Sequence, residues 1–224
     1  MKVLIACEFS GTVRDAFISR GHDAISCDLL PTESDGPHIQ GDVREVLKEP
    51  WDLVIAHPPC TRLCNSGVRW LHERNLWKEM EEAARFFFDC LVANSDRVAV
   101  ENPIMHKYAK KIIGRGPDFT CQPWQFGDAA KKRTCFWTRG LEPLRPTSNM
   151  TGKDAVQEVH LMSPSKDRWK KRSITYQGIA NAMADQWGEE IEDTTGSGQC
   201  SDCDRYGEVG TVCRGCGRGI YLNL

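Results

Sequence analysis

The chain has 224 residues, of which 40% are hydrophobic and 27% charged, with a formal net charge of −2. This size allows one well-packed domain with a small appendage, and the near-zero net charge argues against a generally basic coat for nucleic acid. No stretch reaches the roughly 18 apolar residues of a membrane span, and the N-terminus lacks a signal-peptide pattern, so we expect a cytoplasmic protein without a membrane partner. In that compartment the 11 cysteines are expected as metal ligands, catalytic thiols or buried residues, not disulfides.

The first part of the chain predicts strands alternating with a helix. Runs of strand or helix periodicity fall at residues 2–8 (strand), 13–17 (helix), 22–27 and 38–40 (strands). Phe9-Ser10-Gly11 stands between the first strand and the helix, as at the opening of a nucleotide-binding βαβ unit, although the full GxGxxG pattern is absent. Asp28 and Asp42 follow the next two strands. Asp28 is placed either to accept hydrogen bonds from ribose hydroxyls or only to close a turn.

The most specific signal lies at the end of the strand predicted at residues 51–56. Its apolar run predicts burial on both faces, and Pro58-Pro59 ends it because two prolines remove the donors that a sheet needs. Cys60 follows at once. A side chain just past the carboxyl end of a parallel strand lies where open α/β sheets bind their ligands. Cys60 is therefore either a nucleophile directed by the prolines or a packed thiol.

The elements that follow predict a second site at a strand end. They are a helix at 72–95, a strand at 97–100, a helix at 105–113, strands at 119–124 and 134–138, and a helix at 174–191. Glu101-Asn102 follows the strand at 97–100, and a buried Glu101 would have a raised pKa and act as a proton donor; the alternative is an acid at the start of the next helix. Basic clusters at 107–111, 131–133 and 166–172 are either phosphate contacts or solvated faces.

Composition divides the chain into a main domain at residues 1–192, a linker at 193–199 and a tail at 200–224. Residues 141–172, rich in Pro, Ser, Thr and charge, are expected to form a functional loop. The tail carries two CxxC pairs, Cys200/Cys203 and Cys213/Cys216, a spacing typical of a zinc ribbon with four thiolate ligands. Such a short tail cannot build its own core, so Zn²⁺ would fold it, and a site with no open coordination position is structural.

The strand-end residues together resemble the cytosine-C5 DNA methyltransferases. The resemblance covers roughly residues 1–190, and its motifs occur in the family's order: Phe9-Ser10-Gly11, Asp28, Asp42, Pro58-Pro59-Cys60, Glu101-Asn102 and Gln177-Gly178-Ile179-Ala180-Asn181. It implies an α/β fold, with a Rossmann-like, S-adenosylmethionine-dependent methyltransferase sheet and flanking helices. It further implies roles in cofactor binding, for Phe9, Ser10 and Gly11 in the cofactor loop, Asp28 at the ribose, Asp42 near the adenine, Pro58, and Asn181 in the last motif.

The same resemblance implies a covalent mechanism that the residue types support. C5 of cytosine is a poor nucleophile until a thiolate adds at C6, and cysteine is the strongest side-chain nucleophile near neutral pH. Cys60 would supply the thiolate, and Glu101 would bind the N3/N4 edge and protonate N3. Lys132 or Arg133 would help to hold the flipped base. No residue is identified as the base that removes the C5 proton, and water is equally suitable. The partner is DNA, with the cytosine flipped out of a duplex or in a single strand, and we expect a monomer.

The chain departs from the family in several places. Val13 replaces the second glycine of the first motif, Thr61–Cys64 follows the nucleophile, and Pro103 stands where Val is usual. The large target-recognition region is reduced to residues 141–172, so we expect short or relaxed specificity, as in compact phage enzymes acting in the host cytoplasm. Alternatives are the same chemistry on RNA or a free cytidine nucleotide, transfer of a modified one-carbon group, and an inactive zinc-ribbon DNA-binding protein. Amino-methylating enzymes are disfavoured because they need an aromatic residue in place of Cys60.

Overall fold

The computed structural model divides the chain into two compact units, Met1–Glu189 and Glu190–Leu224. The structure describes residues 1–157, 163, 165 and 168–189, together with the backbone of residues 197–200, 206–208 and 221–222. None of the helices in this part of the chain is long and apolar enough to cross a membrane.

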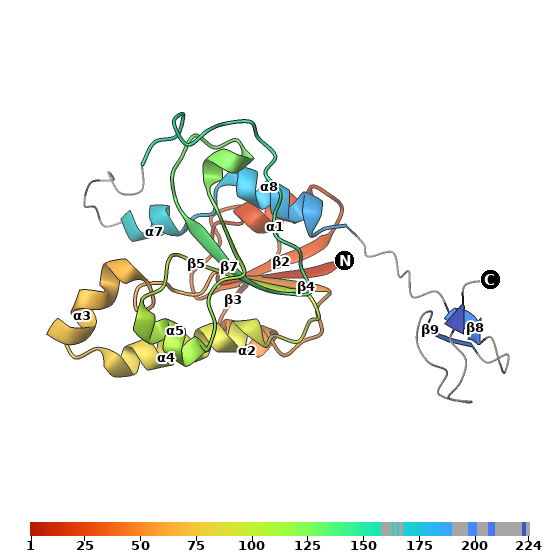
Figure 1. The fold of residues 1–224 in the computed structure, drawn as a ribbon, viewed down its shortest axis with the longest axis horizontal. Helices are drawn as coiled ribbons and strands as arrows, with labels where there is room; N and C mark the ends of the chain where they lie inside the picture. The colour runs from red at the N-terminus through yellow and green to blue at the C-terminus, as the bar shows by residue number, and fades with distance from the viewer. Residues whose placement is uncertain are drawn as a thin grey trace. The chain divides into compact units, whose positions relative to one another are not determined.

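The first unit is built on a seven-stranded sheet with the order β3-β2-β1-β4-β5-β7-β6 (Figure 1). The strands are β1 (Lys2–Ala6), β2 (Asp23–Asp28), β3 (His38–Gln40), β4 (Leu53–Ala56), β5 (Val98–Asn102), β6 (Phe119–Cys121) and β7 (Thr134–Arg139). β1 to β5 are parallel, whereas β7 runs antiparallel to both β5 and β6. The strand order reverses direction at β1, which is the topological switch point where open α/β sheets bind ligands. The predicted Rossmann-like α/β sheet is confirmed.

Helices cover both faces of this sheet, with α1 and α8 on one face and α2, α4 and α5 on the other (Figure 1). The helices are α1 (Thr12–Ile18), α2 (Val43–Val46), α3 (Val68–Glu73), α4 (Trp77–Leu91), α5 (Lys107–Ile113), α7 (Arg168–Ser173) and α8 (Gln177–Gln186), with 3-10 turns η1 (Asn65–Gly67) and η2 (Pro123–Phe126).

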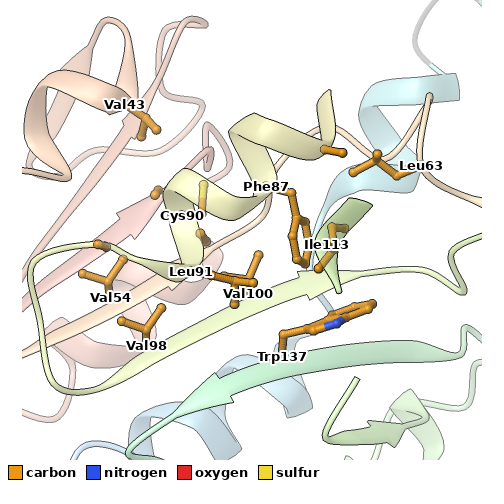
Figure 2. Packing of buried hydrophobic residues seen from close by; sticks show 14 of the residues in the cluster. Val43, Val54, Leu63, Phe87, Cys90, Leu91, Val98, Val100, Ile113 and Trp137 are labelled. Carbon is orange, nitrogen blue, oxygen red and sulfur yellow. The ribbon is translucent and has the colours of Figure 1, made fainter. Parts of the chain in front are cut away.

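The two hydrophobic cores follow from side chains that alternate between the faces of each strand. On the α4 face, Val54, Val98 and Val100 pack with Phe87 and Trp137 (Figure 2). On the opposite face, residues of the same strands, including Ile55 and Ala99, pack with α1 and α8. Glu101 continues the alternation of β5 and so lies on the same face as Ala99. The sheet thus directs the Glu101 carboxylate toward α8.

Several predicted elements differ from the observed ones. The helix predicted at 72–95 is two helices, α3 and α4, because Asn75 adopts a left-handed conformation with φ 51°. The buried residues of α4 are Met80, Ala84, Phe87, Cys90 and Leu91. β5 extends through Glu101 and Asn102, which were predicted to follow it, since pairing with β7 continues to its end. The helix predicted at 174–191 is shorter, and α7 occupies the end of the predicted loop at 141–172.

The second unit contains a three-stranded antiparallel sheet with the order β10-β8-β9, formed by β8 (Ser197–Cys200), β9 (Tyr206–Glu208) and β10 (Tyr221–Leu222). Cys200 ends β8, but its side chain and the predicted ligands Cys203, Cys213 and Cys216 lie outside the described residues. Elsewhere in the described chain no group of three or more His, Cys, Asp or Glu side chains could hold a metal ion. The zinc site therefore stays a prediction, as does the function of the loop at 141–172.

Candidate active site

The candidate site lies where β1 and β4 end side by side at the switch point. The His57 N–H donates to the Ala6 carbonyl (2.9 Å), which carries the pairing of β1 and β4 one residue past the sheet. Beside it, the N–H of Cys7 and of Glu8 both donate to the Cys27 carbonyl (2.7 and 3.3 Å). Cys7 is left-handed, with φ 59°, a rare conformation for a residue with a side chain. This turn brings the start of the glycine loop next to His57.

Glu8 closes the N-terminal end of α1 from inside the protein. Its carboxylate accepts hydrogen bonds from the N–H groups of Val13 (2.7 Å) and Arg14 (3.2 Å), and the residue is only 5% exposed. Burial raises the pKa of Glu8, although the charge of His57 and the helix N–H groups oppose the shift. At Gly11, with φ 77°, a Cβ would lie 2.0 Å from Ser34 Oγ, so glycine is required there. The N–H groups that a phosphate-binding loop would offer to a ligand are thus used by Glu8.

Arg14, fully buried, holds the loop that follows β2. Its guanidinium pairs with Asp15 (2.8 Å) and donates to Ser26 Oγ (3.1 Å), to Ser34 Oγ (2.6 Å) and to the Asp35 carbonyl (3.0 Å). A buried charge is tolerated only when its donors are satisfied. This one side chain therefore fixes the loop against the glycine turn.

The Cys60 loop is held by the chain that leaves β5. Asn102, fully buried, donates from Nδ2 to the Pro58 carbonyl (3.2 Å). The Cys64 N–H donates to the Cys60 carbonyl (3.0 Å), which closes a tight turn. Beyond it, the His106 N–H donates to the Leu63 carbonyl (3.0 Å). Because one end of the loop is tied to Asn102, the last residue of β5, and the other to His106 just beyond it, the positions of Cys60 and Glu101 are coupled.

Cys60 and Cys64 form a hydrogen-bonded thiol pair. The bond from Cys60 lowers the pKa of Cys64 to about 5 against burial, with further donors at Ser66 and Gly67; Ser66 Oγ lies 3.1 Å from Cys64 Sγ. The same bond, burial and the negative charges of Cys64 and Glu101 raise the pKa of Cys60, opposed by Lys132. Within the pair, negative charge is therefore favoured at Cys64 over the half-buried Cys60.

Glu101 is a carboxylate in this environment. Burial alone raises its pKa, but a hydrogen bond from His57 and the charges of Lys132 and His57 outweigh burial and hold the pKa below its usual range. His57 Nδ1 lies 3.4 Å from Glu101 Oε2. The raised pKa predicted for Glu101 is therefore wrong for the protein without substrate, because the sequence did not indicate that His57 and Lys132 would face it.

Two pockets flank the segment 173–176, which joins α7 to α8. The first is lined by Glu101, Lys132, Thr134, Phe136, Thr175, Tyr176, Ile179 and Met183. The second is lined by Cys7, Glu8, Phe9, Ser10, His57, Ser173, Ile174 and Thr175. We call them the Glu101 pocket and the Phe9 pocket. Thr175 lines both pockets.

Lys132 and the Phe9 ring both contact α7. Lys132 Nζ donates to the Arg172 carbonyl (2.9 Å), and its charge acts on Glu101 and Cys60. Phe9 lies 6.5 Å from the Trp169 ring and 5.1 Å from Lys170 Nζ, so α7 covers it. The sequence left Lys132 and Arg133 undecided; Lys132 lines the Glu101 pocket, whereas Arg133 is exposed.

The remaining predicted cofactor residues lie outside these two pockets. Asp28 Oδ1 accepts from the Leu30 N–H (2.9 Å), and Asp42 caps α2 by accepting from the Arg44 N–H (3.0 Å). Asn181 on α8 accepts from Gln177 Nε2 (3.0 Å). The structure adds two residues that the sequence did not single out, Glu8 and His57. The sequence could have indicated both, since each is a titratable residue within two positions of the end of an apolar strand.

Comparisons with known proteins identify no family. No protein-family model matches the chain, and no curated protein does. Among solved structures, one similar chain is that of the Entamoeba histolytica methyltransferase EhMeth, at 15% identity and a TM-score of 0.39. The match covers 73% of this chain and 60% of the EhMeth chain. The class of fold, a Rossmann-like α/β sheet, therefore rests on the strand order and directions of the chain itself.

Proposed function

We propose that this protein transfers a methyl group from S-adenosylmethionine to C5 of cytosine in DNA, through a covalent bond between Cys60 and C6 of the base. The observation that carries the proposal is the grouping of the Cys60 thiol, the Glu101 carboxylate and the Lys132 ammonium at the carboxyl ends of β4 and β5. Cys60 can attack carbon, Glu101 can bind an amino group, and Lys132 can stabilise negative charge. Cytosine activation at C6 requires these three functions.

The Phe9 pocket suits S-adenosylmethionine. It lies at the switch point, presents the Phe9 ring and the Ser10 hydroxyl, and is lined by His57, whose buried Nε2 has no hydrogen-bond partner among the described residues. An aromatic ring and one unpartnered polar atom, His57 Nε2, fit a charged nucleoside ligand. Phe9, Ser10 and Gly11 would hold it, with Asp28 and Asp42 following neighbouring strands. When bound, S-adenosylmethionine supplies the electrophilic methyl group.

The chemical roles follow from the protonation states of the site. Cys60 adds to C6 as its proton passes to the Cys64 thiolate, since the two sulfurs already share a hydrogen bond. Glu101 accepts from the exocyclic amino group. The ring nitrogen N3 of the base is a second acceptor that would face the same carboxyl group, and it would raise the pKa of Glu101. Binding of the base therefore favours protonation of Glu101 and a hydrogen bond from Glu101 to N3. The negative charge from thiolate addition then spreads toward N3 and Lys132.

DNA is the proposed partner because a cytosine in a duplex must leave the stack to reach Cys60, and phosphates need basic contacts. The half-buried Lys131 and the exposed Arg133 flank Lys132, and Lys107, Lys110 and Lys111 lie on α5. The zinc ribbon would add contacts. With residues 141–172 in place of a large recognition region, we propose short or relaxed sequence specificity.

Covalent trapping tests the proposal. The full chain is incubated with S-adenosylmethionine and a duplex carrying 5-fluorocytosine, whose fluorine cannot leave as a proton, and its intact mass is measured. We expect an adduct that maps to Cys60, is lost in Cys60→Ser and forms more slowly in Cys64→Ser. An adduct that maps to Cys64 would reassign the nucleophile. The absence of any adduct on duplex, single-stranded DNA or RNA would refute the proposal and favour a DNA-binding protein.

A second candidate keeps the chemistry and changes the substrate. The short recognition segment is compatible with RNA or a free cytidine nucleotide. Measuring methyl transfer to labelled deoxycytidine monophosphate and to duplex DNA separates the two candidate functions, because only the polymer binds more tightly through the basic residues. Equal rates on both, insensitive to salt, would favour the nucleotide.

A further inference from the structure

One buried histidine lies between the two pockets with half of its hydrogen-bonding capacity unused. The His57 side chain is 8% exposed. Its Nδ1 lies 3.4 Å from Glu101 Oε2, whereas its Nε2 is buried and has no partner among the described residues. A buried polar atom without a partner costs about 1–3 kcal/mol, and such atoms in native structures call for an explanation.

The neighbours of His57 determine which ring nitrogen carries the proton. A carboxylate only accepts, so in the contact with Glu101 the hydrogen lies on Nδ1, and the neutral form of the ring carries its lone pair on Nε2. The same Nδ1–H contact fixes the ring orientation. His57 therefore presents a basic nitrogen whose tautomer is set by Glu101.

His57 also lies where the two reactants would meet. It lines the Phe9 pocket with Cys7, Glu8 and Ser10. On its other side it contacts Glu101, which lines the second pocket. The ring thus stands between the proposed place of the methyl donor and that of the cytosine.

We propose that His57 Nε2 accepts the proton that leaves C5 after methyl transfer, a role that rests on the proposed function. In this step the C5–H bond breaks and its electron pair forms the C5–C6 double bond. The C6–Sγ bond breaks and its pair returns to Cys60 as a thiolate, while the proton forms a bond to Nε2. The resulting imidazolium faces two carboxyl groups, Glu101 and Glu8, and then releases its proton to solvent.

The other polar groups around the pockets are less suited to this step. The Glu8 carboxylate is engaged by the N–H groups of Val13 and Arg14. Glu101 is committed to the edge of the base. Asn102 Oδ1 is also buried without a partner among the described residues, but an amide oxygen is not basic. Histidine has a pKa near neutrality and is the commonest general base in enzymes.

The test separates methyl transfer from release of the product. His57→Gln and wild type are mixed with S-adenosylmethionine and a cytosine duplex carrying tritium at C5. Gln keeps an oxygen near the position of Nε2 without its basicity. We expect methylated DNA to accumulate as a covalent enzyme adduct in His57→Gln, and tritium release to slow by about 10²–10⁴-fold. Wild type should show no such adduct. His38→Gln, the matched change on edge strand β3, should behave as wild type.

Two results would overturn the inference. Tritium release at the wild-type rate in His57→Gln would show that water removes the proton. An equal loss of adduct formation on 5-fluorocytosine and of turnover would show that His57 acts before methyl transfer. Failure of wild type itself to trap on 5-fluorocytosine would refute the proposed function instead, and this step with it. If His57→Gln does not fold, His57→Asn, which keeps a donor toward Glu101, gives the same readouts, and added imidazole should restore its tritium release.

Discussion

Replacing Glu101 by Gln separates its role in catalysis from its role in the fold. Gln has the same shape and can still accept a hydrogen bond from His57, but it removes the charge that faces Lys132. The contact between Glu101 and His57 is long, at 3.4 Å. Removing the negative charge from this contact should therefore reduce the free energy of unfolding by only about 1 kcal/mol. Loss of a group that stabilises charge developing in a transition state typically costs about 3–4 kcal/mol, or about 10²–10³-fold in rate.

The rate is measured as single-turnover formation of the 5-fluorocytosine adduct, and stability by urea unfolding. Glu45→Gln, an exposed change on α2, is the matched control and should alter neither. The lowered pKa of Glu101 also predicts how stability depends on pH. A carboxylate whose pKa is lower in the folded state than its ordinary value of 4.5 stabilises the fold above pH 4.5. This stabilisation is lost as the pH falls through the folded-state pKa. The stability difference between wild type and Glu101→Gln should shrink in that window. If Glu101→Gln forms the adduct at the wild-type rate, the Glu101 carboxylate has no role in the mechanism.

Other changes test the remaining features. Arg14→Met should destabilise the protein by about 3 kcal/mol or more in urea unfolding, because it leaves a buried set of acceptors unpaired. The control Arg20→Met, at an exposed pair with Asp185, should cost under about 1 kcal/mol. Equal effects of the two changes would contradict the assigned role of Arg14. Cys64→Ser should abolish a thiolate ultraviolet titration centred near pH 5, and an unchanged titration would place the thiolate elsewhere. On the prediction that Cys200, Cys203, Cys213 and Cys216 hold zinc, a chelator should weaken DNA binding more than cofactor binding; equal loss of both would mean that the metal is needed to fold the first unit.

The sequence predicted the existence of the strands well because most of them are short apolar runs. Pro58-Pro59 marked the end of β4. The break between α3 and α4 could not be seen, since the residues around Asn75 contain neither Gly nor Pro. β5 was predicted too short because Glu101 is not apolar; its place in the strand comes from pairing with Phe136, which lies far away in the sequence. Tertiary pairing, not local propensity, decided that boundary.

The site was predictable in its residue types but not in its protonation states. Strand-end position indicated Cys60 and Glu101. The pKa direction of Glu101 depends on His57 and Lys132, and that of Cys60 on a hydrogen bond to Cys64, none of which periodicity can indicate.

The position of β7 has a consequence for synthesis on the ribosome. β6 is made before β7, yet β7 lies between β6 and β5 in the sheet, so β6 has no edge to join until the later strand has emerged. The segment 173–176, which lines both pockets and receives Lys132, is made later still. Because chains emerge from their N-terminal end, Cys60 and Glu101 are synthesised well before the residues that complete the Glu101 pocket. In a growing chain this pocket therefore stays incomplete until α8 has left the ribosome.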